Sequence, residues 1–249
     1  MNSKTVGVGV IALLIGLAAG FLLANSLNRT EILALKAQVD RGTANPTTGQ
    51  PDGGNANDLL DPEEIKAKIA QADADPENIT FQKNLGGALY RYGAMRKDTA
   101  LIEQAKRLLE RAHALDKEDY QIIVDLGNAH FDIGYFKKDK ESLKRSRELY
   151  DLALKKKPED ADVRTDLALT YFLQEPADLA KAAAEFESAL RSDPKQERAL
   201  QYLAQTLIRA GDFDKARESV AKLRALNPKN ESIELLESQI ANRKAANVQ

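Results

Sequence analysis

Histidine and cysteine build many catalytic and metal sites, and this chain carries few of them. Its 249 residues include two histidines and no cysteine. His113 and His130 stand far apart, without other ligand-type residues at a metal-binding spacing. The lack of cysteine excludes disulfide bonds, thiolate catalysis, Cys-ligated zinc and iron–sulfur clusters. We therefore expect neither a metal site nor a bound cofactor.

Motifs of enzymes and nucleic-acid binders do not stand out either. The chain has no G-x-S-x-G nucleophile motif and no Walker loop. Gly7-Val8-Gly9 begins a G-x-G pattern, but no predicted strand precedes it and no acidic residue follows at the required distance. The 36 basic and 38 acidic residues nearly cancel, which is not typical of a general nucleic-acid binder. We expect a protein that is not an enzyme; a catalytic subunit would require perturbed acids or histidines gathered in a pocket.

Basic side chains are concentrated between residues 137 and 157. They are Lys137, Lys138, Lys140, Lys144, Arg145, Arg147, Lys155, Lys156 and Lys157. Asp139, Glu141 and Glu148 are interleaved with them, which favours an ordinary solvated helix surface. The alternative is a surface attracted to anionic lipid headgroups.

The N-terminal segment from Val6 to Ala24 contains 19 residues without a charged or polar side chain. This length matches the apolar core of a bilayer when it is helical. Its large apolar residues favour insertion by on the order of 3 to 7 kcal/mol. A cleaved signal peptide is the alternative, but the end of the run lacks a small-x-small cleavage pair. We therefore predict one uncleaved transmembrane helix.

Small residues recur every fourth position within this segment. They are Ala12, Gly16, Gly20 and Ala24. Such a stripe allows two membrane helices to approach closely and predicts a homodimer. The alternative is that glycine and alanine are common in membrane helices. Lys4 precedes the run without acids nearby, which favours a cytoplasmic N-terminus and a following domain in the bacterial periplasm, although basic residues also follow the run.

The composition changes twice after the apolar segment. Residues 1–41 form the predicted anchor and a short juxtamembrane helix, and residues 42–60 form a linker. Residues 42–58 hold four glycines, two prolines and no large apolar residue, so they cannot bury a core. Residues 61–245 follow as a helical domain, beginning at Asp61 with its expected N-cap.

Internal repeats organise the helical domain. Leu85-Gly86 recurs 41 residues later as Leu126-Gly127, then as Leu167-Ala168 and, after 36 residues, as Leu203-Ala204. A period of this size is typical of stacked supersecondary units. The first helix of the first unit is expected to close at Gly93. A second helix follows in each unit, with a small residue and then a large apolar one four positions on; these pairs are Ala105 and Leu109, Ser146 and Tyr150, Ala182 and Phe186, and Ala216 and Val220.

This pattern resembles the tetratricopeptide repeat family over residues 78–230. The resemblance implies an all-α fold: a right-handed α-solenoid of about four helix pairs with end-capping helices. The implied units are a half repeat 61–75, repeats 78–117, 119–158, 160–194 and 196–228, and a capping helix 231–243. The first two repeats carry seven extra residues, about one added turn on each helix, with Asp98 and Asp139 as the expected caps of the second helices.

The resemblance also implies a concave surface formed by the first helix of each pair. Its predicted groove residues are Lys83, Tyr90, Arg91, Val124, Asn128, Phe131, Thr165, Leu169, Phe172, Gln201, Gln205 and Arg209. This mixture suits an extended peptide or a helix, although the aromatic members could instead pack between neighbours. Gly87, Asp125 and Asp166 replace the asparagines and cations with which one subgroup grips a C-terminal carboxylate, so we do not expect a chaperone adaptor of that type.

Together these observations predict a membrane-anchored scaffold that binds a protein or peptide partner. The chain resembles bacterial envelope proteins of this build that assist the assembly of complexes, cytochrome c maturation factors among them. Two alternatives stay open. One is a structural membrane oligomer that acts through its transmembrane helix, and the other is a non-catalytic subunit of an enzyme complex.

Overall fold

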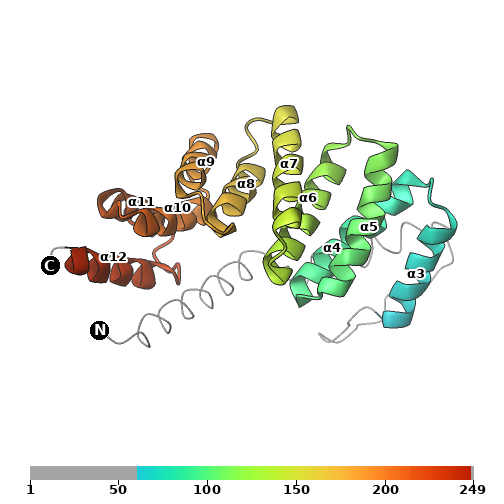
Figure 1. Ribbon diagram of the computed structural model, residues 1–249, viewed down its shortest axis with the longest axis horizontal. Coiled ribbons are helices and arrows are strands. Elements are labelled where there is room, and N and C mark those ends of the chain that lie inside the picture. The colour runs from blue at the N-terminus through green and yellow to red at the C-terminus, as the bar shows by residue number, and fades with distance from the viewer. Residues whose placement is uncertain (1–60, 248–249) are drawn as a thin grey trace.

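The computed structural model describes residues 61–247, which form a curved row of helices (Figure 1). Ten α-helices and no strand occur in this part of the chain. The helices are α3 (Pro62–Ala74), α4 (Ile79–Arg96), α5 (Thr99–Leu115), α6 (Tyr120–Lys137), α7 (Lys140–Lys156), α8 (Ala161–Leu173), α9 (Leu179–Ser192), α10 (Glu197–Ala210), α11 (Phe213–Leu226) and α12 (Ile233–Asn247).

Four helical hairpins make up the row. They are α4 with α5, α6 with α7, α8 with α9, and α10 with α11. Each hairpin contacts the next, and the first helices α4, α6, α8 and α10 also contact one another in sequence. The first helices therefore form one continuous inner layer, which is how stacked repeats bury a shared core.

The first two hairpins are longer than the others, as predicted. Their helices have 17 or 18 residues, against 13 or 14 in the next two hairpins. The predicted caps are confirmed: Asp98 accepts a hydrogen bond from the Leu101 amide at 3.0 Å, and Asp139 accepts one from the Glu141 amide at 3.1 Å. The seven extra residues therefore extend the helices and do not form a long loop.

The end of α4 differs from the prediction. The helix does not close at Gly93 but continues to Arg96, and Lys97 follows in the left-handed conformation at φ 56°. Gly93 lies where α4 meets α5: a Cβ there would be 3.2 Å from the backbone nitrogen of Ile102. The glycine thus serves close helix packing rather than helix termination.

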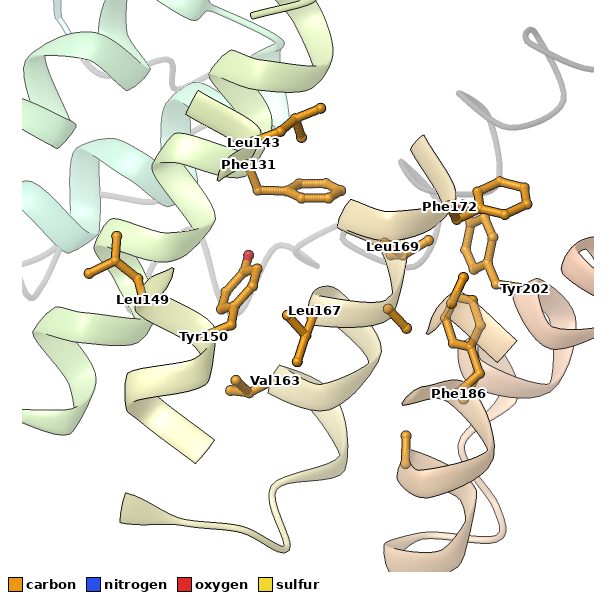
Figure 2. Close-up of a cluster of buried hydrophobic side chains, with 14 of the residues drawn as sticks. Phe131, Leu143, Leu149, Tyr150, Val163, Leu167, Leu169, Phe172, Phe186 and Tyr202 are labelled. Atoms are coloured by element: carbon orange, nitrogen blue, oxygen red, sulfur yellow. The ribbon is translucent and has the colours of Figure 1, made fainter. Parts of the chain in front are cut away.

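Glycine also lets the two helices of a hairpin cross closely. A Cβ on Gly127 would stand 2.8 Å from a ring carbon of Tyr150. The aromatic core continues in the later hairpins, where the Phe186 and Tyr202 rings stack at 6.1 Å and Phe172 meets Tyr202 edge-on at 6.0 Å (Figure 2). These bulky rings fill the spaces between close crossings.

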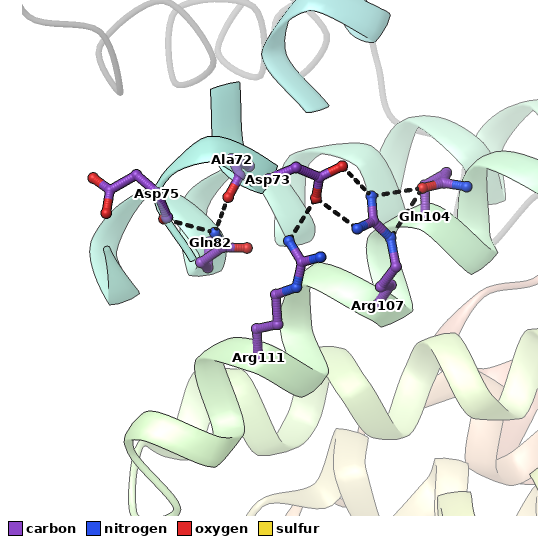
Figure 3. A network of polar contacts seen from close by, with 7 residues as sticks. All are labelled: Ala72, Asp73, Asp75, Gln82, Gln104, Arg107 and Arg111. Atoms are coloured by element: carbon purple, nitrogen blue, oxygen red, sulfur yellow. Dashed lines mark hydrogen bonds and ion pairs between the residues drawn. The ribbon is translucent and has the colours of Figure 1, made fainter. Parts of the chain in front are cut away.

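The N-terminal end of the row is covered by α3. The buried Gln82 side chain donates hydrogen bonds to the Ala72 and Asp75 carbonyls at 2.6 and 3.1 Å (Figure 3). Asp73 accepts hydrogen bonds from Arg107 and Arg111, both at 2.5 Å. Polar contacts thus hold the C-terminal end of α3 against the first hairpin.

The C-terminal end is covered by α12, which buries Ile233, Leu236 and Ile240 against the last hairpin. This helix begins two residues later than predicted and runs to Asn247. The later start has a local cause: the Asn230 side chain accepts a hydrogen bond from the Ser232 amide at 3.0 Å, which forms a turn before the helix.

The predicted anchor, its stripe of small residues and the linker lie outside the described residues. Between residues 61 and 247, no helix combines the length and the apolar character that crossing a membrane requires.

Candidate functional site

The predicted groove residues all lie on the inner-layer helices α4, α6, α8 and α10. Six of them are half-buried: Lys83, Arg91, Val124, Asn128, Gln201 and Gln205. Five are buried: Tyr90, Phe131, Thr165, Leu169 and Phe172. Arg209 is exposed. Thr165, Leu169 and Phe172 are at most 1 % exposed, so in this conformation they pack between helices.

Several groove residues bond to neighbouring helices. The Lys83 ammonium donates to an Asp119 carboxylate oxygen at 2.6 Å. Arg209 donates to the Phe172 carbonyl at 3.0 Å, and its guanidinium lies over the Phe172 ring, 4.5 Å from the centroid. These contacts link successive repeats and fix the two ends of the predicted groove.

A cavity of about 260 Å³ lies between the first three hairpins and α10. Its lining residues are Tyr90, Arg91, Ala94, Gln121, Asp125, Asn128, Phe131, Tyr150, Asp166 and Arg198. Four of the predicted groove residues, Tyr90, Arg91, Asn128 and Phe131, thus come together in one place. The cavity is the candidate functional site.

The sequence prediction of the groove omitted three charged residues of this cavity, Asp125, Asp166 and Arg198. It also omitted Ala94, Gln121 and Tyr150. Gln121, Asp125 and Asn128 occupy positions i, i+4 and i+7 of α6, so helical spacing alone places them on one face. Tyr150 had no comparable signal, because it belongs to the second helix α7. Its ring passes α6 at Gly127, the position without a side chain.

Two Asp–Arg pairs in the cavity differ in how closely they meet. Arg198 donates to an Asp166 oxygen at 2.5 Å, and these side chains are 18 % and 17 % exposed. Arg91 stands 3.8 Å from Asp125, beyond hydrogen-bonding distance. The other Asp125 oxygen accepts a hydrogen bond from Gln121 at 2.9 Å.

Two tyrosine hydroxyls complete the walls. Tyr150 donates to the Asn128 side-chain oxygen at 2.8 Å, and Tyr90 donates to one Asp132 oxygen at 3.2 Å. Figure 2 shows Phe131 and Tyr150 projecting from the second hairpin toward the third. The second Asp132 oxygen is buried without a hydrogen-bond partner, an unfavourable situation for an ionised carboxylate.

Burial dominates the electrostatics of these groups. It raises the pKa of Asp125, with partial compensation by Arg91, and it raises the pKa of Asp132 to about 7. Burial also raises the pKa of Asp166. Burial alone would lower the pKa of Arg198, yet the neighbouring Asp166 and Asp162 carboxylates hold it above its usual value.

Three of the nine basic residues in the cluster at 137–157 form ion pairs with acidic side chains. Lys137 lies 2.5 Å from Glu103, Lys156 pairs with Glu118, and Arg145 lies 2.7 Å from Glu148. Ion pairs of this kind are typical of a solvated helix surface. Between residues 61 and 247, no group of three or more potential ligands could hold a metal ion.

Comparisons with known proteins agree with this architecture. A sequence model of the tetratricopeptide repeat matches residues 173–240. The structure of MamA has a TM-score of 0.54 at 23% identity, over 67% of this chain and 88% of that chain. The fold is that of tetratricopeptide repeats. No curated protein matches the sequence.

Two further tetratricopeptide repeat structures share the fold. YrrB, described as a TPR protein with an unusual peptide-binding site, has a TM-score of 0.55 at 16% identity, over 71% of this chain and 82% of its own. A thermophilic TPR protein of Thermus thermophilus has a TM-score of 0.53 at 17% identity, over 72% of this chain and 89% of its own.

The lining residues of the cavity bring aromatic rings, amides and charged groups together. A polypeptide presents hydrogen-bond donors, acceptors and side chains that match such a surface.

Proposed function

We propose that this protein is a scaffold that binds a protein or peptide partner on the inner layer of its helix stack. The cavity lined by Tyr90, Asn128 and Tyr150 is the observation that carries the proposal. Its lining combines amide and guanidinium groups with aromatic rings, which is the composition of peptide-recognition surfaces. The fold shared with YrrB, which has a peptide-binding site, supports the same conclusion.

The proposal includes attachment to a membrane. The apolar segment 6–24 would span the bilayer, the linker 42–60 would separate the helix stack from it, and the stack would lie in the periplasm of a bacterium. The supporting observations are the apolar run itself and the position of Lys4 before it. In that setting the partner would belong to an envelope complex, such as the one that matures cytochrome c.

Substitutions on the inner layer test partner binding. Val124→Arg and Gln201→Arg place a long cation at half-buried positions of α6 and α10, where they would obstruct a bound polypeptide. Glu187→Arg, at an exposed position of α9, is the matched control. Chemical crosslinking in native cells, followed by purification and mass spectrometry, should recover the same proteins with the wild type and the control but not with the two inner variants. Equal recovery with all four proteins would refute inner-layer binding.

Membrane attachment has its own test. Leu14→Arg places a charge at the centre of the apolar run and costs about 3 kcal/mol of insertion free energy, so the protein should shift from the membrane to the soluble fraction. Gly16→Ile should leave it in the membrane and abolish dimers formed through the small-residue stripe. Undisturbed function of the Gly16→Ile variant would argue against a structural membrane oligomer.

A further inference from the structure

The scaffold proposal does not specify the chemistry of the partner. The lining of the cavity indicates which kind of partner side chain it would bind. We propose that the cavity takes a cationic side chain, arginine or lysine, from the bound polypeptide. This inference rests on the scaffold function and states which feature of the partner the inner layer recognises. It follows from the incomplete bonding of Asp125, from the balance of charge and from the aromatic walls.

Asp125 is the first part of the argument. The residue is 5 % exposed, so water compensates its charge poorly. One of its oxygens is bonded to Gln121, while the oxygen nearest to Arg91 lies 3.8 Å from that guanidinium. An ionised carboxylate can accept about four hydrogen bonds. A guanidinium or ammonium group that enters the cavity would supply the donors that Asp125 lacks.

Gly87 lets α4 pack closely against this carboxylate. A Cβ at Gly87 would lie 2.8 Å from the Asp125 oxygen that faces Arg91 and 3.3 Å from the Arg91 guanidinium. This side of Asp125 is therefore closed by α4, and a ligand cation would have to reach the carboxylate from the cavity.

The charges around the cavity also favour a cation. Asp125 and Asp166 balance Arg91 and Arg198 among the lining residues. Behind the lining, Asp119 pairs with Lys83, and Asp162 accepts a hydrogen bond from Gln196 at 2.7 Å. Asp162 thus adds one acid that no basic side chain balances in this set, which favours a cation over a carboxylate ligand.

The size and the aromatic rings of the cavity fit one long basic side chain. Its volume of about 260 Å³ is below the range of roughly 300–1,000 Å³ that is common for pockets of whole small molecules. Tyr90, Phe131 and Tyr150 contribute three aromatic rings to its lining. Aromatic rings attract cations through their quadrupole, most strongly where water is excluded.

Three capped tripeptides test the inference: acetyl-Gly-Xaa-Gly-amide with arginine, citrulline or glutamate at the central position. Citrulline has the shape of arginine without its charge. The full chain, purified in a non-ionic detergent, is titrated with each tripeptide and binding is followed by ligand-observed NMR. We expect the arginine peptide to bind at least about ten-fold more tightly than the citrulline peptide, because a charged hydrogen bond replaces a neutral one. The glutamate peptide should not bind.

Two variants assign the effect to the cavity. Asp125→Asn keeps the size of the side chain and removes its charge, so the preference for arginine over citrulline should disappear. Asp214→Asn, whose side chain is 84% exposed on α11, removes the same charge elsewhere and should leave the preference intact. Thermal melting followed by circular dichroism verifies that both variants are folded.

Equal binding of arginine and citrulline peptides, preferred binding of glutamate, or no binding of any tripeptide would overturn the inference. The same would follow from an arginine preference that survives in Asp125→Asn. Failure of the scaffold function is distinguishable. If Asp125→Asn still captures the cellular partner while Val124→Arg does not, the scaffold function stands and the cationic side chain is wrong.

Discussion

Asp132 couples the stability of the helix stack to pH. Its side chain is buried in α6 at 1 % exposure, with one oxygen bonded to Tyr90 and the other without a partner. Burial raises its pKa to about 7, and the charge of Asp166 adds to the effect. In the unfolded chain an aspartate has a pKa of about 3.9.

The direction of the pH effect follows from these two values. Between about pH 4 and pH 7 the folded protein retains a proton on Asp132 that the unfolded chain has released. Raising the pH through this window therefore lowers the free energy of unfolding. The gap between the two pKa values corresponds to about 4 kcal/mol, since one pKa unit is worth about 1.4 kcal/mol.

Asp132→Asn removes this titration and keeps an oxygen that can accept the hydrogen bond from Tyr90. The free energies of unfolding of the two proteins differ by a nearly constant amount below about pH 3, where the carboxyl is protonated in both the folded and the unfolded wild type. By about pH 8 the free energy of unfolding of the variant, relative to that of the wild type, should have risen by about 4 kcal/mol. Urea unfolding followed by circular dichroism at a series of pH values measures it, with Asp214→Asn as the exposed control.

The difference between the two proteins is informative where the wild-type profile alone is not, because His130 acts in the opposite direction. Burial, with Lys106 and Arg145 nearby, lowers its pKa to about 4, against about 6.5 when unfolded. The stability that neutral His130 contributes to the folded protein is therefore lost as the pH falls from about 6.5 to 4. A pH-independent difference between wild type and Asp132→Asn would refute the argument.

Three further predictions concern packing and helix ends. Lys97→Gly removes the backbone strain of a left-handed lysine after α4 and should stabilise the protein by about 1 kcal/mol. Gly211→Ala introduces the same strain at φ 84° and should destabilise the protein by a similar amount. Thermal melting compares both variants with the wild type. Gly134→Ala places a Cβ 2.8 Å from the Leu143 backbone nitrogen and should cost about 1–3 kcal/mol in urea unfolding. Gln82→Ala removes one buried and one partly buried hydrogen bond and should cost about 1–3 kcal/mol, with faster hydrogen exchange confined to α3.

The helical hairpins could be predicted from the sequence because the signals for them are local and repeat. Asp98 and Asp139 stand at the same place in two successive units, and each caps a second helix as expected. The ends of the helices are harder to predict from the sequence. Lys97 adopts a left-handed conformation that favours glycine, and nothing in its residue type indicates this, so Gly93 was the more natural choice for the end of α4.

The candidate site was predictable only in part, because it depends on contacts between different helices. Helical spacing indicates that Asn128 lies on the inner face of its helix. The resemblance to tetratricopeptide repeats places Tyr90 and Phe131 on the same inner surface. Tyr150 enters the cavity from the other helix of its pair, and Arg198 reaches it from the fourth hairpin to pair with Asp166. The contact of Tyr150 with Asn128 joins the two helices of one repeat, and that of Arg198 with Asp166 joins two repeats. No spacing within one helix indicates either contact.

The location of the cavity follows from one position that changes from repeat to repeat. Gly87, Asn128, Leu169 and Gln205 correspond under the repeat period. Where glycine stands, the Asp125 carboxylate and the Arg91 guanidinium pack close to α4; where leucine stands, the side chain is 1 % exposed and fills the corresponding region. The side chain at this position therefore changes the surface of the inner layer from one repeat to the next. Recognition of a partner is therefore expected to concentrate on the first two repeats.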